Sequence, residues 1–307
     1  MVIVCMQKYN NAEYQDLMGI IINDAFYVKG SSFDTRIIQI RKIAEIILRR
    51  LLNYRCDYKL TLGNKKIGEM LRERGFTEPL FVDSLSNICD KGNVRGHTQV
   101  TKVATKEEFN TAVDSLFNLF GYMFYKYFKT NKFDSNPDIL TAFSILPPII
   151  RHIALNELFN DDPTNTMVID KLVLAKIKAF NQQEAVNWIE NNKERLQKLL
   201  MSPSDEYREQ LISKMGKIFA ETVIAQLPQN MYEKCRITIE TFKLKNPLYT
   251  DFETALIYYN EHGKVEGSSK EIEEFNSLME FVYSGRKAQE KEISRFDEKD
   301  YIISQMI

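Results

Sequence analysis

The sequence predicts an all-α protein, and two of its properties indicate this. Glycine and proline, which interrupt helices, occur only 12 and 8 times in 307 residues, below their usual levels of about 7% and 5%. Apolar residues recur through most of the chain at the three- and four-residue spacing of a helix face. Short strands remain an alternative at the amino terminus and at residues 236–241, where β-branched residues alternate. We expect two helical domains, spanning about residues 1–130 and about residues 131–307.

The first domain is expected to hold a bundle of amphipathic helices. They are predicted at residues 13–26, 34–54, 65–74, 81–89 and 106–129. Asp34 or Thr35 can cap the second helix, and Thr105 with Glu108 forms a capping box before the last. Residues 91–97 contain two glycines among polar side chains, which predicts a turn.

The second domain is expected to be helical throughout. Its helices are predicted at residues 138–145, 148–159, 166–180, 182–200, 204–227, 229–243, 250–262 and 270–283. Pro148 suits the first turn of its helix, where the missing N–H costs nothing. The segment 286–300 is highly charged, and the apolar tip at residues 301–307 could dock on the core or on a partner.

The charge of the chain is balanced overall but divided along its length. The 41 Lys and Arg against 42 Asp and Glu give a net charge of −1, which argues against a wholly basic nucleic-acid binder. Residues 1–130 nevertheless carry a net charge of +5, and the remainder −6. Residues 36–74 contain eleven cations and only four carboxylates. This local excess of positive charge could bind phosphates. Solvated helix faces and pairs with acids of the second half explain the same pattern equally well.

From the basic half we select the residues expected to contact nucleic acid. They are Arg41, Arg49, Arg50, Lys65, Lys66 and Arg95.

Other motifs point to no cofactor or metal. Cys5, Cys56, Cys89 and Cys235 are far apart and form no CxxC pair, so a zinc site is not expected. No phosphate-binding glycine loop occurs. The sequence shows no signal peptide and no apolar stretch of the roughly 20 residues that a membrane span needs. We expect a cytoplasmic protein with no membrane partner, whose cysteines are free thiols.

The main catalytic candidate is His97, at the end of the predicted polar turn. With Lys91 and Asn93 nearby, it could act as a general acid or base in phosphodiester cleavage, with a cation stabilising the developing charge. Alternatively, Asn93 and His97 cap helix ends through hydrogen bonds. The aromatic run at residues 120–128 could stack on bases, but its helical spacing favours a place in the core.

These motifs together resemble a known family. Arg36, Arg41 and Glu45 on one helix, Leu62 at the start of the next, and the Gly92-Asn93-x3-His97 segment are similar to an all-helical domain of type I restriction endonuclease subunits and other phage-defence proteins. That domain is related to the HEPN superfamily of nucleotide- and RNA-associated helical domains. The resemblance covers about residues 12–130. It implies that His97 and Asn93 are the best-placed site residues. Cys89 stands where family members have an arginine, and Lys91 is the only cation five to seven residues before His97.

The leading hypothesis is therefore a non-catalytic component of an antiviral or restriction-type system that contacts RNA, DNA or a partner effector. One alternative is a metal-independent HEPN-type endoribonuclease that uses His97, Lys91 and Asn93. Another is an oligomeric scaffold, with a protein partner or further copies bound through the aromatic helix and the apolar tip.

Overall fold

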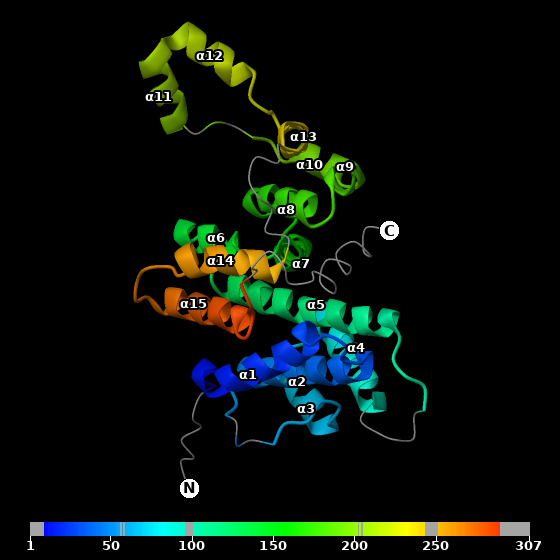
Figure 1. Ribbon diagram of the computed structural model, residues 1–307. Helices are drawn as coiled ribbons and strands as arrows, with labels where there is room; N and C mark the ends of the chain where they lie inside the picture. The colour runs from blue at the N-terminus through cyan, green and yellow to red at the C-terminus, as the bar shows by residue number, and fades with distance from the viewer. Residues whose placement is uncertain are drawn as a thin grey trace. The chain divides into compact units, whose positions relative to one another are not determined.

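The fold is all-α, as the sequence predicts (Figure 1). The computed structural model describes residues 9–55, 57, 59–95, 101–201, 203, 205–242 and 251–288. Within these ranges the regular secondary structure is helical, and the β-structure is one isolated bridge between Leu200 and Asn230.

The contacts divide the chain into two compact units. Unit 1 comprises residues 1–158 and 249–307, and unit 2 comprises residues 159–248. This division differs from the boundary expected near residue 130, because helices on both sides of unit 2 in the sequence pack against the same central helix.

Unit 1 contains one 3₁₀ turn, one π turn and nine α-helices within the described residues. They are η1 (Asn11–Tyr14), α1 (Gln15–Ile22), η2 (Asn23–Tyr27), α2 (Phe33–Leu52), α3 (Lys65–Glu73), α4 (Pro79–Arg95), α5 (Lys106–Thr130), α6 (Pro137–Phe143), α7 (Pro148–Asp161, which runs on into unit 2), α14 (Phe252–His262) and α15 (Lys270–Tyr283).

The central helix of unit 1 is α5, which opens with the predicted capping box of Thr105 and Glu108. Its aromatic run is buried and packs in several directions. Phe120 contacts the rings of Phe252 and Phe281, and Tyr122 stacks on Phe81 of α4 with ring centroids 4.7 Å apart. The prediction that this run belongs to a core is confirmed, and these rings are not available for base stacking.

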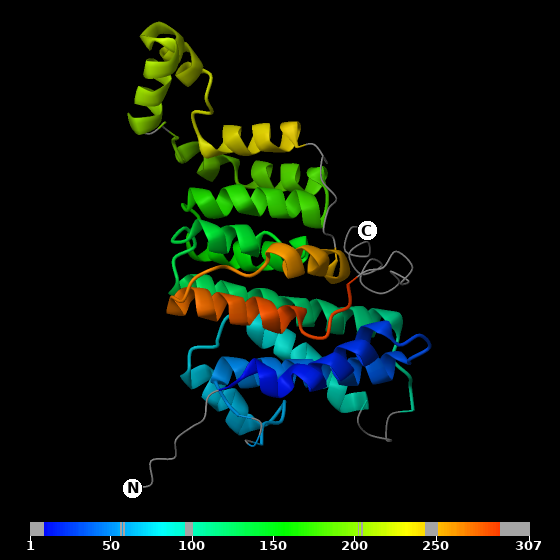
Figure 2. The same cartoon turned by 60° about the vertical axis from the view of Figure 1, so that its left-hand side comes forward.

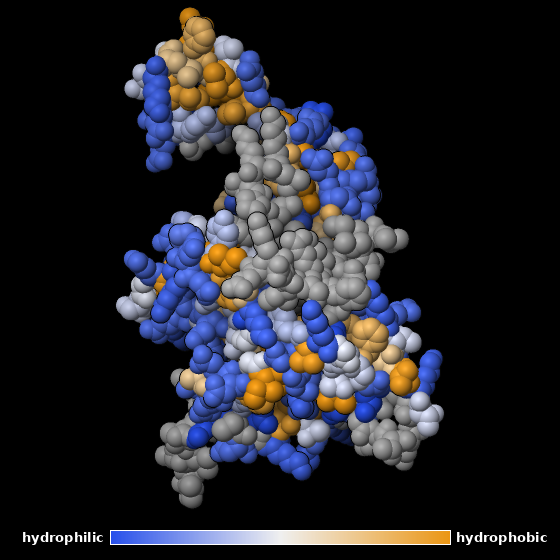
Figure 3. All heavy atoms as spheres, viewed as in Figure 1, coloured by the Kyte–Doolittle hydropathy of each residue, from blue (hydrophilic) through white to orange (hydrophobic). Residues whose placement is uncertain are grey.

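Unit 2 pairs a packed group of helices with a hairpin. The group consists of α8 (Thr166–Ala179), α9 (Gln182–Asn191), α10 (Lys193–Lys198) and α13 (Met231–Thr241), and the hairpin of α11 (Asp205–Met215) and α12 (Lys217–Ala225). Figure 2 shows α11 and α12 side by side, extending away from the other helices of the unit. Figure 3 shows apolar residues at the surface of this hairpin.

Several local expectations differ from the structure. The segment 91–95 is the last part of α4 rather than a turn. The helix expected over 204–227 is broken at Gly216, whose φ of +78° a helix does not allow. The alternative strand at 236–241 belongs to α13, because burial of Cys235 and Ile239 on one helix face outweighs β-branched propensity.

The predicted helix over 182–200 is likewise divided at Asn192. Its side-chain amide donates to the Trp188 carbonyl oxygen at 2.9 Å and so competes with the continuing helix ladder. The alternative strand at residues 1–8 and the apolar tip at 301–307 lie outside the described residues.

Candidate functional site

The Gly92-Asn93 pair lies inside α4 and faces α2. A Cβ on Gly92 would be 2.6 Å from Cδ of Arg41, so only glycine lets this arginine cross the helix. One residue on, the Asn93 amide donates to Sγ of Cys89 at 3.3 Å. Two expected site residues, Arg41 and Asn93, are thus brought to the same part of the bundle, while His97 lies outside the described residues.

Two residues of α2, Arg41 and Glu45, hold the segment that leads into α3. The Arg41 guanidinium donates to the Leu62 carbonyl oxygen at 3.4 Å, and the Leu62 N–H donates to Oε1 of Glu45 at 3.3 Å. Gly63 then turns with a φ of +82°, and a Cβ there would be 2.8 Å from Sγ of Cys89. We call Arg41, Glu45, Cys89 and Asn93 the polar cluster.

Cys89 in this cluster is not arranged as a nucleophile. Burial raises the pKa of its thiol, against the opposing effect of the nearby Arg41 charge. Because the thiolate is the reactive form of cysteine, the raised pKa favours a packing role.

Three of the residues expected to contact nucleic acid make interactions within the chain. The Arg95 side chain is 5% exposed and bridges Asp34 at 3.3 Å and Glu108 at 2.8 Å, which ties α4 to the starts of α2 and α5. Arg49 donates to the carbonyl oxygen of Arg55 at 2.8 Å.

Arg50 is held by residues from distant segments of the chain. Its guanidinium donates to Asn11 at 2.6 Å and to Oγ of Ser277 at 3.1 Å, beside the rings of Tyr9 and Phe281. Burial lowers the pKa of Arg50. A phosphate would have to displace these partners in order to reach it.

Two of the expected contacts, Lys65 and Lys66, are exposed at the start of α3. Lys65 makes one long ion pair with Glu69, at 3.9 Å, and its side chain is 90% exposed. Arg72, at the other end of α3, is also exposed. Lys91, the remaining catalytic candidate, is half-buried on α4. Of the residues expected to contact nucleic acid, the exposed ones therefore lie at the start of α3, next to a cavity.

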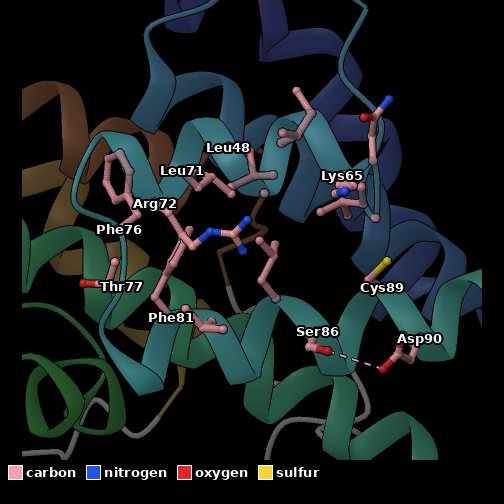
Figure 4. A pocket seen from close by; sticks show the side chains of 17 residues that line it. Leu48, Lys65, Leu71, Arg72, Phe76, Thr77, Phe81, Ser86, Cys89 and Asp90 are labelled. Carbon is pink, nitrogen blue, oxygen red and sulfur yellow. Dashed lines mark hydrogen bonds between the residues drawn. The ribbon is translucent and has the colours of Figure 1, made fainter.

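This cavity has a volume of about 430 Å³ and lies between α3 and α4, with α2 behind it (Figure 4). That size is typical of a site for a small ligand or a bulky side chain. Its apolar lining consists of Leu48, Leu62, Ile67, Leu71, Phe76, Phe81, Val82 and Leu85. Its polar lining includes Asn64, Lys65, Arg72, Ser86, Cys89 and Asp90.

The two ends of the cavity differ in chemistry. Figure 4 shows Phe76 and Phe81 at one end, and Lys65, Cys89 and Asp90 at the other. Arg72 extends between the two helices. Cys89 belongs to both the cavity and the polar cluster, so the two features form one continuous candidate site. Lys65 and Arg72 against Asp90 leave the lining with one positive charge in excess, so an occupant that matches it has an apolar part and an anionic part.

The sequence did not predict this cavity, although Leu62, Lys65 and Cys89, which line it, were singled out from the sequence. The helix periodicity of α3 places Ile67 and Leu71 on a buried face. This periodicity does not show that α4, the facing helix, lies far enough from α3 to leave a cavity between them. Gly68 was the available signal, because it lines the cavity and a Cβ there would meet nothing within 4 Å.

The chain shows no match to protein-family models, to curated proteins or to solved structures. In the described part of the chain, no cluster of His, Cys, Asp or Glu side chains is suited to hold a metal ion. None of the helices described is both long enough and apolar enough to cross a bilayer.

Proposed function

We propose that this chain is a non-catalytic recognition component of an antiviral or restriction-type defence system, and that its α3–α4 cavity binds an acidic amphipathic segment of a partner effector. One observation carries the binding proposal: an apolar cavity lies directly beside exposed cations. The defence context rests on the resemblance of residues 12–130 alone.

The cavity chemistry defines the partner segment. Apolar side chains of the partner would enter between Leu71 and Phe81, where they lose contact with water. Carboxylates beside them would pair with Lys65 and Arg72 at the rim. A helix with apolar residues at three- and four-residue spacing and acids between them presents both groups on one side.

The same geometry favours a protein partner over a nucleic acid. Arg49, Arg50 and Arg95 are engaged within the chain, so the predicted basic stretch offers fewer cations than the sequence indicates. Arg41 likewise bonds to the segment before α3. Lys65 and Arg72, which remain exposed, line an apolar cavity, and a phosphate backbone would leave that cavity unfilled.

A fluorescein-labelled synthetic helix of Leu and Glu tests the proposal by fluorescence anisotropy. We expect it to bind the full chain, and a matched peptide with Ser in place of Leu not to bind. Gly68→Leu should abolish binding by filling the cavity, since nothing stands within 4 Å of that position. Gly19→Leu is the control, because it adds the same side chain to an equally open helical position outside the cavity.

Charge variants separate the two classes of partner. Arg72→Glu should weaken peptide binding by about fivefold or more, whereas Lys42→Glu, exposed on α2 and outside the cavity, should not. Failure of the peptide to bind would contradict the proposal. So would tight binding of single-stranded RNA that Gly68→Leu leaves unchanged.

The endoribonuclease alternative keeps one supporting observation, because Arg41 supplies a cation beside Asn93 in the polar cluster. RNA cleavage in EDTA that is lost in His97→Ala would establish it against the non-catalytic proposal. The scaffold alternative loses its aromatic surface, since the run at residues 120–128 is inside unit 1.

A further inference from the structure

The hairpin of unit 2 carries a continuous exposed turn. Residues 213–219, here called the hairpin tip, are all exposed and join α11 to α12 through Gly216. Three of them are apolar: Met215 is 42% exposed, Ile218 85% and Phe219 70%. Large side chains left this open by their own unit mark a surface that something else covers.

The charge of the hairpin tip is positive. Lys214 and Lys217 flank Gly216, and no carboxylate occurs between residues 213 and 219. The acids of α11 are Asp205, Glu206 and Glu209, all in the first half of that helix, before the tip. Glu221 of α12 lies 3.5 Å from Arg208. Bulky apolar groups and cations therefore share one end of the hairpin, and the carboxylates lie toward the other.

The exposed apolar surface is short along the helix axis. Ala220 and Ile224 of α12 are buried, and Thr222 is exposed but polar, with its hydroxyl donating to the Ile218 carbonyl oxygen at 3.0 Å. A helix that lies in a protein groove needs an apolar stripe over two turns or more. One turn of apolar side chains flanked by lysines suits shallow insertion into a negatively charged lipid interface.

We propose that the hairpin tip docks on an anionic lipid surface. Ile218 and Phe219 insert at the boundary between headgroups and acyl chains, and Lys214 and Lys217 contact the lipid phosphates. Peripheral binding of this kind requires no membrane-spanning helix, and it is independent of the cavity between α3 and α4.

Insertion can be followed directly by fluorescence. Trp188 is the single tryptophan, so Phe219→Trp in a Trp188→Phe background of the full chain reports on the hairpin tip alone. We expect a blue shift of emission with phosphatidylcholine vesicles that contain phosphatidylserine, and none with phosphatidylcholine alone. Brominated acyl chains should quench this emission, because the ring lies at their depth.

Co-sedimentation of the wild-type chain with the same vesicles measures the contribution of each group. Lys214→Ala with Lys217→Ala should reduce the partition coefficient by about thirtyfold, and Ile218→Ser with Phe219→Ser by about tenfold or more. Leu200→Ser is the matched control, since Leu200 is 80% exposed in the same unit but outside the tip. Circular dichroism checks that each variant is folded.

Several results would overturn the proposal. The first is a wild-type chain that does not sediment with phosphatidylserine vesicles. The second is binding that the tip variants leave unchanged. The third is a concentration-dependent dimer, seen in sedimentation velocity without lipid and lost in the Ile218→Ser and Phe219→Ser variant, which would assign the tip to a second copy of the chain.

Discussion

Arg41 crosses α4 directly over Gly92, where a Cβ would come within 2.6 Å of the arginine Cδ and 3.1 Å of its Cβ. This contact brings the middle of α2 close to the last turns of α4. It also explains the glycine of the Gly-Asn pair as a packing requirement rather than a turn signal.

Gly92→Ala should therefore destabilise the chain, by about 1–3 kcal/mol, because the methyl group has no room. Gly68→Ala on α3 is the matched control, since a Cβ there meets nothing within 4 Å. It should stabilise by up to about 1 kcal/mol through helix propensity. Urea unfolding measures both. Arg41→Ala should relieve the cost of Gly92→Ala in a double-mutant cycle, and additive effects would show that the contact is not the cause.

Arg50 and Lys66 should respond differently to charge reversal, although both were expected to bind nucleic acid. Arg50→Glu places a carboxylate beside the rings of Tyr9 and Phe281 and removes the bonds to Asn11 and Ser277. We expect a loss of about 3 kcal/mol or more in the free energy of unfolding. Lys66→Glu, at an exposed position, should change it by less than about 0.5 kcal/mol. Equal effects in thermal unfolding would contradict this assignment.

Glu108 should make the chain less stable in acid. Its carboxylate accepts the Thr105 backbone N–H at 2.8 Å and pairs with Arg95, and these contacts lower its pKa. A carboxyl group with a lowered pKa in the folded state contributes stability above its ordinary pKa of about 4.3. That contribution is lost as the pH falls through the folded value.

Glu108→Gln tests this pH dependence. The variant should lose stability at pH 7, by about 1 kcal/mol, and should show a shallower decline below about pH 4.3 in urea unfolding. Glu107→Gln, an exposed neighbour in the same first turn, is the control. An unchanged acid slope in Glu108→Gln would exclude Glu108 as its source.

Asp114 on α5 should act in the opposite direction. Burial raises the pKa of its carboxyl group to about 7. A folded pKa above the unfolded value of about 3.9 means that stability falls as the pH rises from about 4 to 7. Asp114→Asn should remove this fall and stabilise the chain at pH 8 by about 1 kcal/mol or more. Chemical denaturation at pH 5 and pH 8 gives the comparison, and an equal effect at both values would contradict the raised pKa.

The sequence determined the fold class and most helix positions of this protein. The apolar spacing along α2, the capping box of Thr105 and Glu108, and Pro148 at the start of α7 are all local signals. They act between residues a few positions apart, so the chain itself displays them.

The tertiary structure decided which charged residues are free to act. Arg50 and Lys66 belong to the same basic stretch, yet one contacts two rings from distant segments and the other faces solvent. It also decided the cavity between α3 and α4 and the exposed apolar turn at Ile218 and Phe219. Whether a side chain is covered depends on helices far away in the sequence, and local periodicity contains no information about their separation.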